Sequence, residues 1–494
     1  MYPAPAGAKT KADPAAFVSE LTARTELDGS SLESLALGLA GGGVAARARL
    51  ALLEAEGKRG LAAVIGAYAR LDGPGRDLAR RIIDAAPCKD KLGLYIPHLT
   101  GKDREEADRA RDRIRRCGKD AGPPLLAALE AAKGDARIAV AEEAAFVAPD
   151  AAVPFLVLAL DAAKTPDERR PFRRAIGKAA TRDVGVRALG RALADPMFGQ
   201  LSLAARVDFL RALGDEAPRV EGSAAALAAA SKAATAFRER YLLLSPASSL
   251  AKSGDKGALT VLGSALSDKA EHRLRARGAE LAAGIAPLRP KLLVLIDDPE
   301  VRVREAALGA LASKGALDGA ATIKLLVRLV KDPWTFVRRA AAAALVSAPT
   351  SAETDKSIGA AVDFEPSPIV RAEMMSTLGA RRAKVAAPVV AERAFDQRET
   401  ADVRSRALEA LGDMCATEHL EAITELALRG QAPVFEADRK LAIAGITALG
   451  RLRPADLKTR LAPLSAKSAP AEIREVTRLV LADPARPCPA SATK

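Results

Sequence analysis

The chain has 494 residues, of which 49% are hydrophobic but only 3% aromatic, with Ala, Leu and Val as the main apolar residues. This composition argues against ordinary globular domains with large cores and favours many thin interfaces between closely packed helices. The formal net charge of +13 gives the protein a moderate attraction for acidic partners or nucleic acid. The sequence contains no run of 18 or more apolar residues, so no membrane-spanning helix is predicted.

Residues 1–29 are predicted to be an N-terminal tail that could include a capping helix over 13–23. Asp13 would be its N-cap and Pro14 its first residue. The opening residues lack a basic stretch followed by an apolar core, so no signal peptide is predicted from the chain as written. A mature exported protein that has gained a new Met1 is the alternative.

Residues 30–484 are predicted to be a repeat array, because similar segments recur along them. Val-Arg pairs end at Arg304, Arg338, Arg371 and Arg404, which are 34, 33 and 33 residues apart. Extending this arginine column outward predicts about fourteen units of roughly 33 residues. Its members are Arg47, Arg76, Arg109, Arg137, Arg173, Arg206, Arg238, Arg275, Arg304, Arg338, Arg371, Arg404, Arg439 and Arg474.

Each unit is predicted to be a helical hairpin. In the clearest one, positions 323, 326, 327 and 330 fall on one helical face, which predicts the packing face of a first helix. Asp332-Pro333 then breaks the chain, and a second helix begins at Trp334. Leu-Gly pairs at 378–379 and 411–412 suggest where second helices end.

These residues resemble the HEAT-repeat family, in particular its compact bacterial, PBS-lyase-type variety. The match is specific over about 290–412 and degenerate over the rest of 30–484. The resemblance implies an all-α, right-handed α-solenoid of about 14 HEAT-like hairpins, with an armadillo-like surface for partners. It also implies that the arginines pair with acidic residues of the turns, such as Asp298 or Asp332. Relatives of this kind include chromophore lyases and DNA glycosylases, but no residues for either activity can be located.

The first functional hypothesis is a non-enzymatic scaffold that binds a protein partner along the exposed face of the second helices. The column would then be a basic stripe and not only a structural ladder. Trp334 would be either a packed turn residue or a binding hot spot. The candidate surface comprises Arg302, Arg304, Arg338, Arg339, Arg371, Arg404, Arg406 and Trp334.

The alternative function is the binding of nucleic acid or another polyanion by a dense basic run. The acidic residues just before it, from Asp103 to Asp108, could instead neutralise it as part of a solvated helix. The run comprises Arg109, Arg111, Arg113, Arg115, Arg116 and Lys119.

Four cysteines leave the compartment open. Cys88 could pair with Cys117 if the loop at Cys88 leans inward, since packed helices lie about 10 Å apart and a disulfide needs about 7 Å. Cys415 could pair with Cys488 if the tail, predicted to be disordered over 485–494, folds back. Two disulfides would fit a periplasmic or exported protein, and four free thiols a cytoplasmic one.

No catalytic residue, cofactor or metal site is predicted. The three histidines, His98, His272 and His419, are far apart and form no ligand motif, and no phosphate-binding glycine loop occurs. The sequence does not determine the oligomeric state.

Overall fold

The computed structural model describes residues 27–100, 104–269, 271–313, 317–483 and 488. These residues form α-helices and short 3₁₀-helices joined by turns, and no strand occurs among them, so the all-α prediction is confirmed. The chain divides into two compact units, residues 1–233 (unit 1) and 234–494 (unit 2). The predicted capping helix over 13–23 and the tail over 485–494, apart from Cys488, lie outside the described residues.

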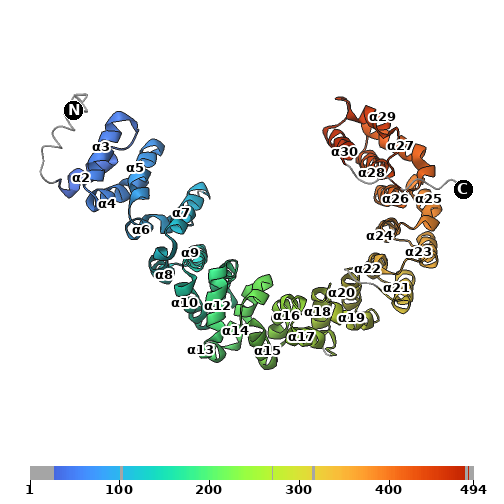
Figure 1. Ribbon diagram of the computed structural model, residues 1–494, viewed down its shortest axis with the longest axis horizontal. Coiled ribbons are helices and arrows are strands. Elements are labelled where there is room, and N and C mark those ends of the chain that lie inside the picture. Colours follow the sequence, from blue (N-terminus) through green and yellow to red (C-terminus); the bar gives the residue numbers. More distant parts are fainter. Residues whose placement is uncertain (1–26, 101–103, 270, 314–316, 484–487, 489–494) are drawn as a thin grey trace, which may run out of the picture. The chain divides into compact units, whose positions relative to one another are not determined.

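Unit 1 consists of helices in two layers, A and B, that alternate along the chain (Figure 1). Layer A contains α2 (Gly29–Leu37), α4 (Lys58–Ala67), α6 (Cys88–His98), α8 (Gly122–Ala131), α10 (Pro149–Ala162), α12 (Asp183–Ala194) and α15 (Ser223–Ala233). Layer B contains α3 (Gly43–Ala55), α5 (Gly73–Ala85), α7 (Arg104–Arg116), α9 (Gly134–Val147), α11 (Pro166–Ala180) and α14 (Leu203–Leu213). The shorter elements are α13 (Pro196–Gln200), η1 (Tyr68–Arg70), η2 (Gly118–Ala121) and η3 (Gly214–Arg219).

Unit 2 repeats the same alternation. Its layer A contains α17 (Lys256–Leu266), α19 (Arg289–Leu295), α21 (Gly319–Lys331), α23 (Ala352–Phe364), α25 (Ala387–Phe395), α27 (Leu420–Leu428) and α29 (Leu457–Leu461). Its layer B contains α16 (Phe237–Lys252), α18 (His272–Leu281), α20 (Val301–Leu311), α22 (Thr335–Ala344), α24 (Pro368–Ala380), α26 (Ala401–Met414), α28 (Glu436–Leu452) and α30 (Ala471–Ala482). The 3₁₀-helices are η4 (Ala286–Leu288), η5 (Leu345–Ser347), η6 (Lys384–Ala386), η7 (Thr417–His419), η8 (Arg429–Gln431) and η9 (Ala462–Ser465).

All fourteen arginines of the predicted column lie in layer B helices. The column therefore marks the second helix of successive hairpins, as the repeat pattern predicted. None of the described helices is long and apolar enough to cross a membrane.

Local sequence signals define where many helices begin. Asp318 caps α21 by accepting the N–H of Ala321 at 2.7 Å. Thr165 and Glu168 form a capping box at the start of α11, where Pro166 is the first helical residue. Such caps satisfy backbone donors that have no partner within the helix, so each turn ends one helix and starts the next.

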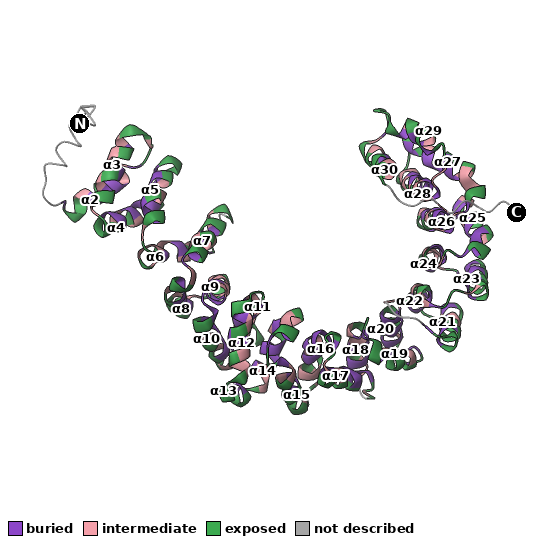
Figure 2. Ribbon diagram, viewed as in Figure 1, coloured by how far each residue is buried: buried purple, intermediate pink, exposed green. Residues whose placement is uncertain are grey.

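The core runs as a thin band between the two layers (Figure 2) and is built from Ala, Leu, Ile and Val. Small residues set the spacing within layer B. A Cβ at Gly379 would lie 2.8 Å from the Cα of Ala410, and one at Gly412 would lie 2.9 Å from the Cα of Ala448. Gly379 is the penultimate residue of α24 and Gly412 lies two residues before the end of α26, so the Leu-Gly pairs mark the ends of these helices as the sequence suggested, and they also allow close helix packing.

The packing face predicted for α21 is wrong. Ile323, Val327 and Val330 are exposed, whereas Leu325 and Leu329 are fully buried. Both sets recur with helical spacing on this apolar helix, so periodicity alone could not select the buried one. The hairpin itself is as predicted, because α21 ends before Asp332 and α22 begins at Thr335.

Candidate binding surface

The arginine column forms a ladder of ion pairs between successive hairpins. Arg304 of α20 donates from Nε and Nη2 to the two carboxylate oxygens of Asp332, at 2.9 and 3.2 Å. Its Nη1 donates to the carbonyl oxygen of Asp298, in the turn of its own hairpin, at 2.9 Å. Asp332 also accepts the N–H of Trp334 at 3.1 Å, and its side chain is 0% exposed. One buried carboxylate thus joins two hairpins.

This arrangement recurs along unit 2. Hydrogen bonds to Asp298 raise the pKa of Arg275, and hydrogen bonds to Glu365 raise the pKa of Arg338, so both guanidinium groups stay charged. The ladder consists of Arg240–Asp268, Arg275–Asp298, Arg304–Asp332, Arg338–Glu365 and Arg371–Glu399.

Four of the eight residues predicted to form the candidate surface are therefore not exposed. Arg304, Arg338 and Arg404 are buried, and Arg371 is largely buried in its pair with Glu399. The prediction that these four arginines present an exposed basic stripe is wrong, because their guanidinium groups point into the interface between hairpins. Arg404 differs from the others in that its Nε donates only to the carbonyl oxygen of Ala394, at 3.2 Å.

Two outer members of the column are displaced from the ladder. Arg238 is exposed, and Arg240 makes the pair with Asp268 in its place. In unit 1, Arg169 makes the shorter contact with Asp208, at 2.8 Å, compared with 3.3 Å for Arg173. The sequence missed Arg240 and Arg169 because several arginines lie near each column position.

The other four predicted residues, Arg302, Trp334, Arg339 and Arg406, are exposed on layer B of unit 2. Arg302, Trp334 and Arg339 line a groove of about 1300 Å³ that crosses α16, α18, α20 and α22 and reaches Glu373 of α24; we call it the central groove. Arg406 lines a second groove over α24, α26 and α28, which shares Arg339 and Glu373 with the first. The two grooves therefore form one continuous surface.

Aromatic side chains distinguish the central groove. Phe237 and Tyr241 of α16 line one end, and Trp334 and Phe336, at the start of α22, line the other. Trp334 and Phe336 are each 55% exposed, so the interpretation of Trp334 as a packed turn residue is wrong. Phe336 is close to Trp334 in the sequence, but Phe237 and Tyr241 are nearly 100 positions away, and only the fold brings them to the same groove.

Charges in the central groove are mixed. Four arginines face three glutamates, and two of the contacts are direct: Arg277–Glu280 at 2.8 Å and Arg339–Glu373 at 3.6 Å. Small residues, among them Ala276, Ala306 and Gly309, lie between the charged side chains. The groove is thus an aromatic and small-residue surface with nearly balanced charge, which does not favour a polyanion.

The basic run of α7 is neutralised within unit 1. Each of its five arginines has a carboxylate partner, and Lys119 of η2 is exposed. The predicted polyanion patch is therefore a solvated helix whose arginines are paired with carboxylates. Two of these carboxylates, Asp84 of α5 and Glu143 of α9, come from neighbouring helices and were not indicated by the sequence. The pairs are Arg109–Glu105, Arg111–Asp108, Arg113–Asp84, Arg115–Glu143 and Arg116–Asp112.

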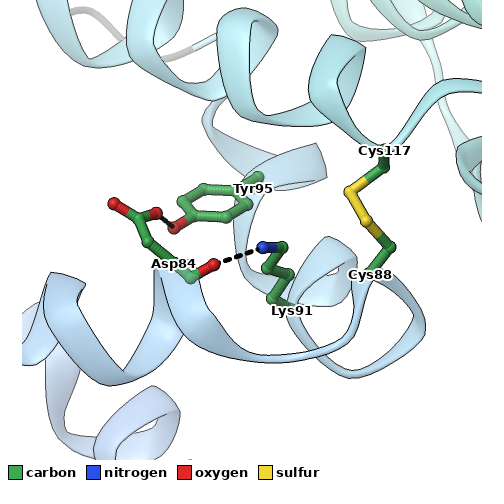
Figure 3. Close-up of a disulfide and its surroundings, with 5 residues drawn as sticks. All are labelled: Asp84, Cys88, Lys91, Tyr95 and Cys117. Atoms are coloured by element: carbon green, nitrogen blue, oxygen red, sulfur yellow. Dashed lines mark hydrogen bonds between the residues drawn. A yellow bond between two sulfur atoms is a disulfide. The ribbon is translucent and has the colours of Figure 1, made fainter.

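Both cysteine pairs are disulfides. Cys88 and Cys117 have Cα atoms 5.6 Å apart, as do Cys415 and Cys488. Figure 3 shows the first disulfide, which joins the first residue of α6 to the residue after α7. The Cα atoms of Cys88 and Cys117 lie closer together than the axes of two packed helices, because Cys88 is the first residue of α6 and lies beside the end of α7.

A polar cluster lies beside this disulfide (Figure 3). In Figure 3 the hydroxyl of Tyr95 donates to the carboxylate of Asp84 at 2.9 Å, and Lys91 donates to the Asp84 carbonyl oxygen. Arg113 also donates to both carboxylate oxygens of Asp84. Burial, together with the hydrogen bond to Asp84, raises the pKa of Tyr95, so Tyr95 stays protonated. The cluster has structural partners for all its groups and indicates no reaction.

Among the described residues, no group of three or more His, Cys, Asp or Glu side chains is placed to hold a metal ion. The three histidines lie in different hairpins.

No protein-family model and no curated protein matches the chain. Solved structures do match. A structure of Kap95p with RanGDP, from work on nuclear import complex assembly, is 12% identical with a TM-score of 0.50; the match covers 92% of this chain and 66% of that one. A crystal structure of a Kap121p mutant is 14% identical with a TM-score of 0.51, over 88% of this chain and 55% of that one.

The chain spans about two thirds of the length of the first of these proteins and about half of the second. At such low identity the likeness concerns the fold alone. Together with the layered hairpins and the arginine ladder, it shows that this chain is a HEAT-like helical-repeat solenoid.

Proposed function

We propose that the chain is a non-enzymatic scaffold that binds a protein partner along the central groove of unit 2. The observation that carries the proposal is the exposure of Trp334, the only tryptophan of the chain, beside Phe336 in that groove. Aromatic side chains are scarce in this chain, and several of them exposed together in one groove form an apolar patch of the kind that marks an interaction site. Tryptophan in a groove is also the residue most enriched at binding hot spots.

The architecture supports this proposal. Solenoids present long continuous surfaces that contact extended partners. Kap95p, a protein of similar fold, binds RanGDP. The period of about 33 residues and the Arg-acid ladder further support a PBS-lyase-type variety of the repeat. Balanced charge in the groove and paired arginines on α7 leave no observation in favour of the polyanion alternative.

Replacing both Trp334 and Phe336 by Ala is expected to weaken binding of the partner at least about 30-fold, since two hot-spot contacts together contribute 2 kcal/mol or more. The partner is first captured on the immobilised protein and identified by quantitative mass spectrometry, and its affinity for each variant is then measured. The wild-type protein should also show a blue shift of Trp334 fluorescence when the purified partner is added.

Phe364→Ala is the matched control, because Phe364 is 85% exposed at the end of α23 and does not line the central groove. This variant should bind as the wild type does. A partner that binds the double variant and the wild type equally, without a change in tryptophan emission, would show that the binding surface lies elsewhere.

We further propose that the protein works in an oxidising compartment, outside the cytoplasm. Its two disulfides support this, since such bonds persist mainly in exported or periplasmic proteins. Protein isolated from its own organism under alkylating conditions should expose no free thiol before reduction and four afterwards, counted by mass spectrometry. Four alkylated cysteines before reduction would contradict the assignment.

A further inference from the structure

The arginine ladder stops at Arg404. In the turns that lead into α20, α22 and α24, the ladder carboxylate lies two residues before the N-cap residue of the helix and accepts the backbone N–H of that N-cap residue. In the hairpin before α26 it lies one residue before. The turn that leads into α28 has no such carboxylate, because its residues are Gln431, Ala432, Pro433 and Val434, followed by the N-cap residue Phe435.

Arg404 is therefore a buried cation that has lost its expected partner. It is 9% exposed, its Nε donates to the carbonyl oxygen of Ala394, and among the described residues it forms no ion pair with a carboxylate. Burial lowers the pKa of Arg404, and the charge of Arg429 lowers it further, while the charges of Asp396 and Asp438 act in the opposite direction. Asp438 is engaged as an acceptor for the N–H of Phe435 at 3.2 Å.

Exposed apolar side chains lie in the same turn. Val434 is 80% exposed and Phe435 is 70% exposed. Phe435 is the N-cap residue of α28, the position that Trp334 holds before α22. A buried charge without a partner and two exposed apolar side chains are both unfavourable in water, and one ligand that carries a carboxylate and apolar groups would relieve both.

We propose that an acidic peptide segment of a protein partner docks at this turn, with an Asp or Glu side chain completing the ladder at Arg404 and flanking apolar residues covering Val434 and Phe435. The ligand carboxylate takes the place that Asp332 holds beside Arg304. None of Arg404, Val434 and Phe435 lines the central groove, so this proposal does not depend on the proposed function.

The test uses a random-peptide library displayed on phage and selected against the full, disulfide-intact chain. Selected peptides should carry Asp or Glu next to apolar residues. Their affinity should fall at least tenfold for Arg404→Met, which is expected to fold because it removes an unpaired buried charge. Arg406→Met, two positions away and exposed, is the matched control and should bind as the wild type does.

A second variant supplies the missing carboxylate from within the chain. Pro433→Glu should raise the unfolding midpoint and abolish binding of the selected peptides, because its side chain occupies Arg404. The variant with Ala at both Trp334 and Phe336 should retain peptide binding, which separates this site from the groove.

Selection of peptides without a carboxylate, or equal binding by wild type and Arg404→Met, would overturn the proposal. So would an oligonucleotide that binds in an Arg404-dependent manner in place of peptides, since it would identify a phosphate ligand.

Discussion

Replacement of Arg304 by Met is expected to lower the free energy of unfolding of unit 2 by about 3 kcal/mol or more, because it leaves Asp332 buried without its main partner. The Asp332 side chain has no exposed surface, and Arg304 supplies two of its hydrogen bonds. Arg328, at 3.4 Å, and the N–H of Trp334 remain and compensate only in part. Urea unfolding followed by Trp334 fluorescence measures the change.

Arg404→Met is the matched control for this experiment, since the same chemical change at an equivalent position removes a cation that has no carboxylate partner. It should change the free energy of unfolding by less than about 1 kcal/mol, or raise it. The double variant Arg304→Met/Asp332→Leu should recover most of the loss, because no charge is then left buried. Equal destabilisation by Arg304→Met and Arg404→Met would mean that the ladder stabilises through packing of the arginine stems alone.

The architecture could be predicted because its signals are local and repeated. A proline turn, an arginine one turn into the next helix and an alanine-rich stretch recur about every 33 residues, and each places the start of a layer B helix. Most ladder partners follow a similar spacing: Arg240–Asp268, Arg304–Asp332 and Arg371–Glu399 are 28 positions apart and Arg338–Glu365 27, whereas Arg275–Asp298 is 23. A regular spacing lets one sequence motif indicate its contact in the next hairpin.

Exposure could not be predicted, because it depends on the face of the helix that meets a neighbour. Arg302 and Arg304 are two residues apart, about 200° around a helix, so one faces the groove and the other the interface between hairpins. The same holds for Arg404 and Arg406. The sequence pattern alone predicts all four arginines on one surface, and only the arrangement of the helices in layers separates the exposed pair from the buried pair.

The aromatic groove and the missing ladder step differ in what sequence could have shown. The groove brings together α16 and α22, whose aromatics share no sequence period, so it required the fold. The break after Arg404 was visible in principle, since Pro433 occupies the position of a ladder acid. The HEAT-repeat resemblance implied that the arginines pair with acidic turn residues, but only the structure shows that Arg304 and its equivalents pair with the turn of the following hairpin.

Removal of the first disulfide by Cys88→Ala/Cys117→Ala is expected to lower the free energy of unfolding of unit 1 by about 3.6 kcal/mol, the entropy of closing a loop of 29 residues in the unfolded chain. The cross-link joins α6 to the end of α7, so the loss should be concentrated in this hairpin. Urea unfolding by circular dichroism measures the stability, and hydrogen exchange of the native protein shows which helices lose protection.

The wild-type protein treated with a reductant is the companion experiment, because it breaks both bonds without a substitution. Exchange should then rise at α6 and α7 and, separately, around Cys415 at the end of α26, whose partner Cys488 is 73 residues away. The double variant should raise exchange at α6 and α7 alone. If it unfolded at the urea concentration of the wild type, the 88–117 bond would not constrain the unfolded chain, and the stability of this hairpin would come from the Asp84, Tyr95 and Arg113 cluster beside it.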